Sequence, residues 1–436
     1  MTNITKIYGW GRYPQQDAYL HTPASYESLE IIAKKKNSML ARGMGRSYGD
    51  SANALNVLQT TYINHFIEFD KVTGILTAEA GITLREILEV IVPCGWFLPV
   101  TPGTSYVTLG GAIASDVHGK NHHISGTFGQ HVMSMNMLLG TGEVVSISPQ
   151  HYADLFHATC GGMGLTGVIM SATIQLIPVR SSLISQQKIK ANCIEAACEA
   201  FESNSYATYS VAWIDCLSKR KNLGRSVIML GEHAELGGLN IDIRQKVSVP
   251  LSTPSALLNR VTMKAFNTAY WNKAKQSVSH IVKLTPFFYP LDAVGEWNKL
   301  YGKKGFMQFQ CVVPKIDGVA NMRRLLTEIS NSGEGSFLAV LKQFGIANEN
   351  LLSFPTEGYT LALDFKVSET AIKTVKKLED MVVEMGGRLY LTKDAVMQET
   401  SFKTTYPNWE KFELVREKYG AIGKFRSTQS KRLGLA

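Results

Sequence analysis

The pattern of apolar and polar positions predicts a sheet with helices in the first part of the chain. Apolar residues recur at helical spacing over residues 24–36. Thr83 and Glu86 form a capping box that opens a helix over residues 84–92. Runs rich in β-branched residues predict strands, over 73–82, 142–148 and 167–179.

The pattern changes after about Pro178. The elements it predicts are a helix at 194–202, strands at 209–214 and 306–313, a helix at 318–330, strands at 337–342 and 360–365, a helix at 370–385 and a strand at 388–390. The last six follow the order β-α-β-β-α-β, which is typical of an α+β unit with an antiparallel sheet. Residues 218–280 carry scattered Ser, Asn, Gly and Lys, and we expect them to be irregular, with a mobile loop.

The composition narrows the class of protein. A length of 436 residues favours two domains, and the apolar and charged fractions of 45% and 19% are typical of a soluble globular protein. The chain has no long apolar run or hydrophobic leader, and its six cysteines show no metal-binding spacing. We therefore expect a cytoplasmic protein with reduced thiols and no metal.

A net charge of +9 favours an anionic partner, which could be a phosphate group, a membrane surface or a nucleic acid. The basic residues form no long tract and no nucleic-acid-binding motif. A nucleic-acid partner is therefore not expected.

Three glycine-rich stretches carry the strongest chemical signal, and they cover residues 41–51, 101–123 and 161–167. Glycine lets backbone approach a ligand closely, and the second stretch adds three histidines and one lysine. None of the three fits a Rossmann or a Walker A fingerprint. Together they favour a long phosphorylated cofactor held by backbone amides, with titratable groups beside it.

Four strings resemble the vanillyl-alcohol oxidase/p-cresol methylhydroxylase (PCMH-type) superfamily of flavoproteins. They are RGMGRSYGD (42–50), PGTSYVTLGGAIASDVHGKNHH (102–123), CGGMGLTGVIM (160–170) and GGRLYLTKD (386–394). Within it, the chain most closely resembles the decaprenylphosphoryl-β-D-ribose 2′-oxidase family, nearly end to end. The resemblance implies an α+β fold with two domains. These are an FAD-binding domain over 1–178, completed by 391–436, and a substrate domain over 179–390 built on an antiparallel sheet flanked by helices.

The resemblance also implies the cofactor and its contacts. The FAD-binding positions it implies are Ala41, Arg42, Gly43, Met44, Gly45, Arg46, Ser47, Tyr48, Gly49, Asp50, Gly103, Thr104, Thr108, Leu109, Gly110, Gly111, Ser115, His118, Gly119, Asn121, Gly164, Ile169 and Tyr390. Many relatives tether FAD covalently through a histidine of the first glycine-rich loop. That position corresponds to Tyr48 here, so we expect non-covalent FAD.

The chemistry implied is hydride transfer from a carbinol carbon to the flavin. Lys393 matches the family's active-site lysine and would stabilise the anionic reduced flavin. Lys120 and His118 are the other catalytic candidates, as a substrate-facing cation and as a group that orients the hydroxyl or accepts its proton. The substrate-binding positions implied are Lys120, Trp213, Gln308, Gln310, Lys342 and Lys393. Gln308 and Gln310 alternate along one strand and so face the same side.

One position departs from the family's pattern. The mycobacterial members carry a cysteine, the target of covalent inhibitors, where this chain has Ala362, and an asparagine where it has Thr360. Hydride transfer requires neither residue, but the pocket wall is altered. We expect weak sensitivity to inhibitors that trap that cysteine.

The function that the resemblance implies is oxidation of a secondary sugar hydroxyl at C2, as the first half of an epimerisation in cell-wall or polysaccharide biosynthesis. The expected substrate is a polyprenyl-phosphate-linked pentose such as decaprenylphosphoryl-β-D-ribose. The expected partners are a separate NAD(P)H-dependent keto-reductase and an electron acceptor, which could be a quinone, O2 or another compound. Peripheral contact with the inner membrane would suit a lipid-linked substrate.

Other functions stay open at this point. The same fold serves oxidases and dehydrogenases of soluble sugars, alditols and aldonolactones. The chain could also bind flavin without turnover, although Lys393, Lys120 and His118 argue against that.

Overall fold

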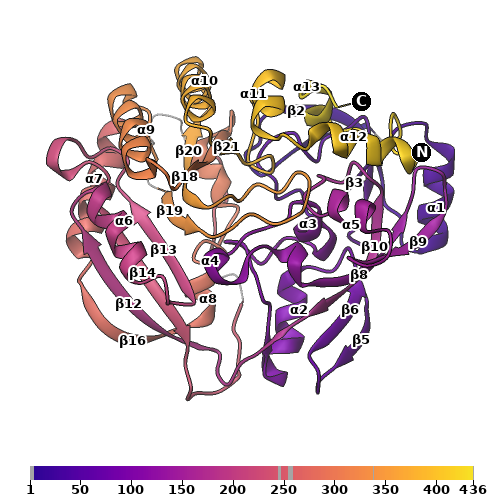
Figure 1. Ribbon diagram of the computed structural model, residues 1–436, viewed down its shortest axis with the longest axis horizontal. Helices are drawn as coiled ribbons and strands as arrows, with labels where there is room; N and C mark the ends of the chain where they lie inside the picture. Colours follow the sequence, from indigo (N-terminus) through magenta and orange to yellow (C-terminus); the bar gives the residue numbers. More distant parts are fainter. Residues whose placement is uncertain (1–3, 244–246, 254–258, 337, 436) are drawn as a thin grey trace.

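The computed structural model describes residues 4–243, 247–253, 259–336 and 338–435. Figure 1 shows two smaller sheets in one half of the molecule and a large sheet in the other. The first small sheet has the order β1-β2-β4-β3, in which β1 and β2 are antiparallel while β4 runs parallel to β2 and β3. Its strands are β1 (Ile4–Tyr8), β2 (Gln15–His21), β3 (Leu40–Arg42) and β4 (Asn56–Gln59).

The second small sheet is antiparallel and has the order β5-β6-β10-β8-β9. Its strands are β5 (Phe66–Asp70), β6 (Ile75–Glu79), β8 (Val132–Leu138), β9 (Val144–Ile147) and β10 (Val168–Gln175). The helices of this half are α1 (Tyr26–Lys35), α2 (Leu84–Ile91), α3 (Leu109–Ala114), α4 (His122–Ser125) and α5 (Ala153–Thr159). The predicted capping box is confirmed, because Thr83 Oγ1 accepts from Glu86 N while the Glu86 carboxylate accepts from Thr83 N.

The large sheet has eight strands in the order β16-β12-β14-β13-β19-β20-β18-β21. They are β12 (Leu183–Ala191), β13 (Tyr209–Ile214), β14 (Ser226–His233), β16 (Ser277–Lys283), β18 (Phe306–Pro314), β19 (Ala339–Phe344), β20 (Gly358–Lys366) and β21 (Arg388–Leu389). Every pairing between them is antiparallel. The predicted order β-α-β-β-α-β is confirmed, with α9 (Gly318–Ser332) and α10 (Glu369–Glu384) as its helices.

The prediction that residues 218–280 are irregular is wrong for three parts of the stretch. It contains β14, the helix α7 (Arg260–Lys273) and the first part of β16, while residues 244–246 and 254–258 lie outside the described part. β16 is the edge strand of the large sheet, and Asn267 is the only buried residue among those described in α7. Elements at a sheet edge or on a surface bury little apolar area, so their sequences carry little periodicity.

The two faces of the large sheet have different environments. One face packs on α6 (Ile194–Ser203), α9 and α10, through buried residues such as Ile214, Leu341 and Leu361. The other face is turned toward the glycine-rich loops and lines a cavity. Because side chains alternate along a strand, even-numbered residues of β18, β19 and β20 face the cavity, and so do odd-numbered residues of β13.

The C-terminal segment returns to the first half of the molecule, as the yellow helices of Figure 1 show. It comprises α11 (Glu399–Thr405), α12 (Trp409–Lys418) and α13 (Thr428–Arg432). Phe425 forms a β-bridge with Met39, and the buried Arg416 donates from Nε to the Leu165 carbonyl at 3.0 Å. These contacts are compatible with the division 1–178 plus 391–436 and 179–390, which we keep as a proposal.

Candidate active site

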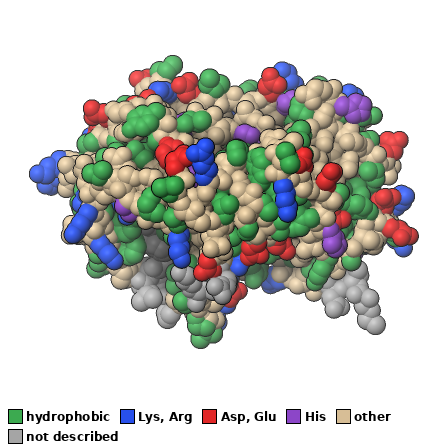
Figure 2. Space-filling view, turned by 90° about the horizontal axis from the view of Figure 1, so that it is seen from below, with side chains coloured by type: hydrophobic (Ala, Val, Ile, Leu, Met, Phe, Trp, Pro, Cys, Tyr) green, Lys and Arg blue, Asp and Glu red, His purple; other side chains and the backbone are tan. Residues whose placement is uncertain are grey.

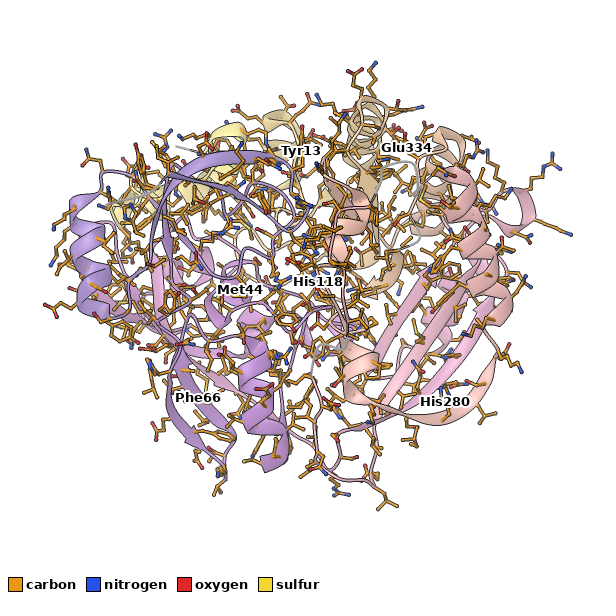
Figure 3. All side chains as sticks on the ribbon, turned by 180° about the vertical axis from the view of Figure 1, so that it is seen from behind. Tyr13, Met44, Phe66, His118, His280 and Glu334 are labelled. Carbon is orange, nitrogen blue, oxygen red and sulfur yellow. The ribbon has the colours of Figure 1, made fainter. Side chains whose placement is uncertain are left out.

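A cavity of about 790 Å³ lies between the glycine-rich loops and the large sheet. In Figure 3, His118 lies near the middle of the molecule, between the loop that carries Met44 and the strands of the large sheet. Segments far apart in the sequence thus meet around one space. All three predicted glycine-rich stretches contribute to its wall.

Most residues predicted to hold the cofactor line this cavity. They are Ala41, Arg42, Gly43, Met44, Gly45, Arg46, Ser47, Tyr48, Gly103, Thr104, Thr108, Gly110, Gly111, Ser115, His118, Gly119, Gly164, Ile169 and Tyr390. Gly103 borders open space, because a Cβ built there would meet no atom of the described residues within 4 Å. Gly43 instead packs against protein, since its Cβ would lie 2.2 Å from Thr108 Oγ1.

Four predicted cofactor residues do not line the cavity and instead support its wall. Leu109 is fully buried in the core of the first half. Asn121 donates from Nδ2 to the Pro99 carbonyl at 2.8 Å. Gly49 abuts the Asp394 backbone, where a Cβ would lie 1.8 Å from the carbonyl oxygen, and Asp50 forms an ion pair described below.

Lys393 is partly buried and lies in the part of the cavity wall that also holds Gln308, Gln310 and His118, which we call the inner end. Its Nζ lies 3.9 Å from the centre of the Tyr48 ring. Burial lowers the pKa of Lys393 to about 7, although the Asp364 carboxylate nearby raises it. Asp364 accepts from Gln308 Nε2 at 2.7 Å and from Tyr301 OH at 3.1 Å, and burial raises its own pKa to about 7. The inner end therefore holds an acid and a base that both titrate near neutral pH.

His118 is enclosed by the aromatic rings of Phe344, Phe354 and Tyr390. Burial lowers its pKa well below the usual value, so the imidazole is neutral. Gln310 donates from Nε2 to His118 Nε2 at 3.0 Å, and this hydrogen-bond pattern assigns the proton to Nδ1. Nδ1 is buried without a hydrogen-bond partner in the described part of the chain. A donor left in this state is suited to an acceptor on a ligand.

Lys120 and Lys342 form a second group of cations, next to His118. Lys120 donates from Nζ to the Phe288 carbonyl at 3.1 Å, and Lys342 donates to the Gly119 carbonyl at 3.4 Å. Burial lowers the pKa of Lys120 to about 7 and that of Lys342 to about 8, and Lys342 further lowers that of Lys120. An anionic ligand would relieve both effects and stabilise the charged forms.

The register of the large sheet aligns four cavity residues in a row. Gln310 pairs with Ala362, Ala362 pairs with Val340, and Val340 pairs with Trp213. Directly opposed residues of antiparallel strands point to the same face. Together with residues of the neighbouring loops, all six predicted substrate residues line this one cavity. They are Lys120, Trp213, Gln308, Gln310, Lys342 and Lys393.

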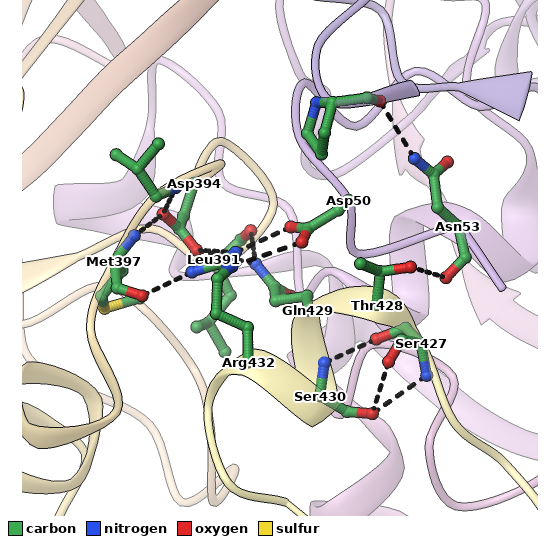
Figure 4. A network of polar contacts seen from close by, with 12 residues as sticks. Asp50, Asn53, Leu391, Asp394, Met397, Ser427, Thr428, Gln429, Ser430 and Arg432 are labelled. Atoms are coloured by element: carbon green, nitrogen blue, oxygen red, sulfur yellow. Dashed lines mark hydrogen bonds and ion pairs between the residues drawn. The ribbon is translucent and has the colours of Figure 1, made fainter. Parts of the chain in front are cut away.

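The C-terminal helix ties two site loops together, as Figure 4 shows. Arg432 Nη2 lies 2.7 Å from Asp50 Oδ1 and 2.8 Å from Asp394 Oδ2. Gln429 donates from Nε2 to the Leu391 carbonyl at 2.8 Å and to Asp394 Oδ2 at 3.1 Å. These contacts fix the first glycine-rich loop and the loop that carries Lys393 relative to each other.

Sequence reasoning missed several residues of the cavity wall. Asp364 carried a weak signal, because it follows Ala362 at strand spacing and so faces the same side. Asp292, which accepts from Ser105 N at 2.7 Å, carried none. Others missed are Trp10, Tyr106, Lys188, Met229, Phe266 and Tyr270.

Comparison with known proteins identifies the class. Residues 21–148 match the family described as "FAD binding domain". This match, together with the two-part α+β fold and the full-length oxidase relative described next, defines an FAD-dependent oxidoreductase.

The particular family follows from a full-length relative. The chain is 35% identical over 453 residues to the decaprenylphosphoryl-β-D-ribose oxidase of Mycolicibacterium smegmatis, a match that covers 100% of this chain and 98% of the relative. The chain therefore belongs to the decaprenylphosphoryl-β-D-ribose oxidase family of FAD-binding flavoproteins.

Relatives named as lactone oxidases or dehydrogenases are more distant. The chain is 30% identical to the L-gulonolactone oxidase of Scyliorhinus torazame, over 34% of each chain. It is 20% identical to the L-gulono-1,4-lactone dehydrogenase of Mycobacterium tuberculosis, over 97% of this chain and 98% of the relative. The alternative of a soluble lactone substrate is therefore not favoured.

Proposed function

We propose that the protein oxidises the C2 hydroxyl of a pentose linked to a polyprenyl phosphate, as the first half of an epimerisation. The observation that carries this proposal is the grouping of Lys393, Gln310 and His118 at the inner end of a cavity that continues along the sheet. The named activity of the mycolicibacterial relative supports the substrate class.

The residues present fit non-covalent FAD. The open space at Gly103 and the backbone of the glycine-rich loops suit a pyrophosphate, which peptide N–H groups bind well. Tyr48, at the position where many relatives of the superfamily carry a tethering histidine, lies under the Lys393 ammonium and packs against Phe306. When bound, FAD would accept the hydride that leaves the carbinol carbon, and the hydroxyl proton would leave to a base or to water.

Each polar group at the inner end would serve that transfer. Lys393 would place its positive charge beside the flavin, which becomes anionic when it is reduced. Exclusion of water from this site strengthens the electrostatic stabilisation. His118 is neutral and would orient the substrate hydroxyl through Nδ1–H. Gln310 fixes the His118 ring, and Gln308 holds Asp364 near Lys393, so both amides would act as positioning residues.

Lys120 and Lys342 would bind the phosphate of the substrate. They are adjacent, partly buried cations, and each donates a hydrogen bond to a backbone carbonyl. A phosphate between them would raise both lowered pKa values and would place the attached sugar beside His118.

Contact with an anionic membrane surface is part of the proposal. Between Asp242 and Asp292 the sequence has seven Lys and Arg residues and neither Asp nor Glu. Figure 2 shows Lys and Arg side chains along the left outline, the end of the molecule that carries α7 and β16 in Figure 1. None of the described helices is long and apolar enough to cross a bilayer. Cosedimentation with anionic but not with neutral vesicles, lost in high salt, is the expected result.

Anaerobic bleaching of the flavin tests the proposed reaction. Decaprenylphosphoryl-β-D-ribose should bleach the flavin, and free ribose, alditols and aldonolactones should not. Bleaching by a free sugar alone would favour a soluble substrate, and a flavin that no alcohol bleaches would indicate a non-catalytic flavoprotein. A purified keto-reductase with NAD(P)H should then convert the keto product, while a quinone or O2 reoxidises the enzyme.

A further inference from the structure

The cavity is longer than a sugar requires. From Gln310 the aligned row crosses Ala362 and Val340 before it reaches Trp213. Three steps between strands correspond to about 14 Å. A pentose held beside Lys393 fills only the inner end, so the outer end is left for the group attached to the sugar.

The chemistry of the wall changes along this direction. The inner end has amide and carboxylate groups, and the two lysines Lys120 and Lys342 follow. On the strands beyond Lys342 the wall is apolar at Val211 and Trp213 of β13 and at Met229 of β14, which is paired with Val211. It is polar again at Gln186 and Lys188 of β12, which is the next strand. A ligand that fits this order is polar at one end, anionic in the middle and apolar beyond.

Helix α7 completes the apolar end with aromatic rings. The Tyr270 ring lies 4.5 Å from that of Trp213, and the Phe266 ring lies 6.2 Å from that of Tyr270, centre to centre. Their exposed fractions rise from 7% for Trp213 to 37% for Tyr270 and 46% for Phe266, although all three line the cavity. The three rings therefore form a path from the interior to the surface.

The helix that carries these rings is anchored independently of them. Asn267 is fully buried and donates from Nδ2 to Asp215 Oδ1 at 2.9 Å, and Trp271 lies under the Lys190 ammonium at 4.2 Å. The outward side of α7 carries Arg260 and Val261, which face solvent. Substitutions at Phe266 and Tyr270 should therefore change the path without removing the helix.

We propose that this outer chamber, bounded by Val211, Trp213, Met229, Phe266 and Tyr270, binds the first isoprenoid units of a polyprenyl phosphate. The inference rests on the proposed function and names the part of the same cavity that recognises the lipid. Methyl-branched, unsaturated chains pack well on aromatic faces and remove apolar wall from water. The two lysines then lie where the phosphate joins the chain to the sugar.

The test uses the FAD-loaded protein and two sugar-free probes, farnesyl phosphate and methyl phosphate, whose affinities are measured by calorimetry. The wild type should bind farnesyl phosphate at least tenfold more tightly than methyl phosphate. The double variant Phe266→Ser/Tyr270→Ser should lose about tenfold in affinity for farnesyl phosphate and bind methyl phosphate unchanged. Val261→Ser, on the outward side of α7, is the matched control and should behave as the wild type.

Conservative variants keep the test decisive. Phe266→Leu with Tyr270→Phe retains apolar surface and should retain the preference for farnesyl phosphate. Equal loss of both probes in the serine variant, or no loss of either, would overturn the proposal. Loss of binding to lipid vesicles with unchanged farnesyl phosphate affinity would assign the rings to the bilayer instead and would also overturn it.

Failure of the proposed sugar oxidation and failure of the proposed isoprenoid chamber give different experimental results. If ribosyl lipids never bleach the flavin while farnesyl phosphate still shows the ring-dependent preference, the sugar oxidation fails and the isoprenoid chamber stands. If ribosyl lipids bleach the flavin at equal efficiency in the wild type and the serine variant, the reaction stands and the chamber fails.

Discussion

The glycine-rich loops and the cavity face of the large sheet meet at one cavity, but they are encoded differently. In the loops, neighbouring wall residues are also neighbours in sequence, as in the run from Gly43 to Tyr48. On the sheet, Gln310, Ala362, Val340 and Trp213 come from four strands and meet only through register. A cofactor site can therefore be contiguous in sequence, whereas the site that selects the substrate is assembled by pairing.

The largest effect is expected from substitution of Lys393, which should reduce catalysis without affecting the loops that hold the cofactor. Lys393→Ala should retain FAD, because the loops that hold it are untouched, and should slow anaerobic flavin bleaching by about 10²–10³-fold. Absorbance of the bound flavin gives both readouts. A variant that bleaches at near the wild-type rate would remove Lys393 from the mechanism.

The next prediction concerns the ion pairs of Arg432 with Asp50 and Asp394, which join the first glycine-rich loop to the loop that carries Lys393. Arg432→Ala leaves Asp50 and Asp394 buried without their cation, and we expect unfolding to become easier by about 3 kcal/mol, with partial loss of FAD. Lys431→Ala, the exposed neighbour, should leave the thermal unfolding midpoint unchanged. Equal midpoints for the two variants would show that the Arg432 contacts contribute nothing.

The loop region can be changed without disturbing the fold. Gly103→Val adds a side chain toward open space, so the unfolding midpoint of the apoprotein should stay unchanged while FAD affinity falls about tenfold. Gly43→Val, which meets Thr108 at once, should instead destabilise the apoprotein. Unchanged FAD affinity in Gly103→Val would place the cofactor elsewhere.

The pH dependence tests the charge at the inner end. Burial lowers the pKa of Lys393 to about 7, so its ammonium form predominates below that pH and is lost as pH rises through it. If the cation assists transfer, the bleaching rate should fall as pH rises through about 7. Lys393→Arg stays charged over this range and should flatten the profile. A rate that rises instead would make Lys393 the base.

The smallest effect concerns the sheet wall. Electrophilic inhibitors that trap the family's cysteine should add no mass to the wild type after turnover, because Ala362 occupies that position. Cys311, on the adjacent strand, faces the helix-covered side and is fully buried. Ala362→Cys should acquire a mass increase of one inhibitor with nearly unchanged bleaching. Modification of the wild type would contradict this account.

Much of the architecture was predictable because it is local. The capping box at Thr83, the order of β18 to β21 and the three glycine-rich stretches follow from patterns within short windows of sequence. The helix α7 and the strand β16 were not predictable in this way, because an element that buries few residues shows weak periodicity. Asp292 and Phe266 were missed for a different reason, because only the packing of distant segments brings their side chains to the cavity.

By itself, the sequence determined the resemblance to a flavoprotein family, the cofactor loops and the chemical groups at Lys393, Lys120 and His118. The tertiary structure decided which of these share a cavity, that Arg432 joins the two site loops, and that burial makes His118 neutral and brings the pKa of Lys393 near 7. The physical reason is that register, burial and long-range pairing depend on residues that are far apart in the sequence, such as Asp50 and Arg432. Backbone flexibility and cap chemistry, in contrast, are set by immediate neighbours.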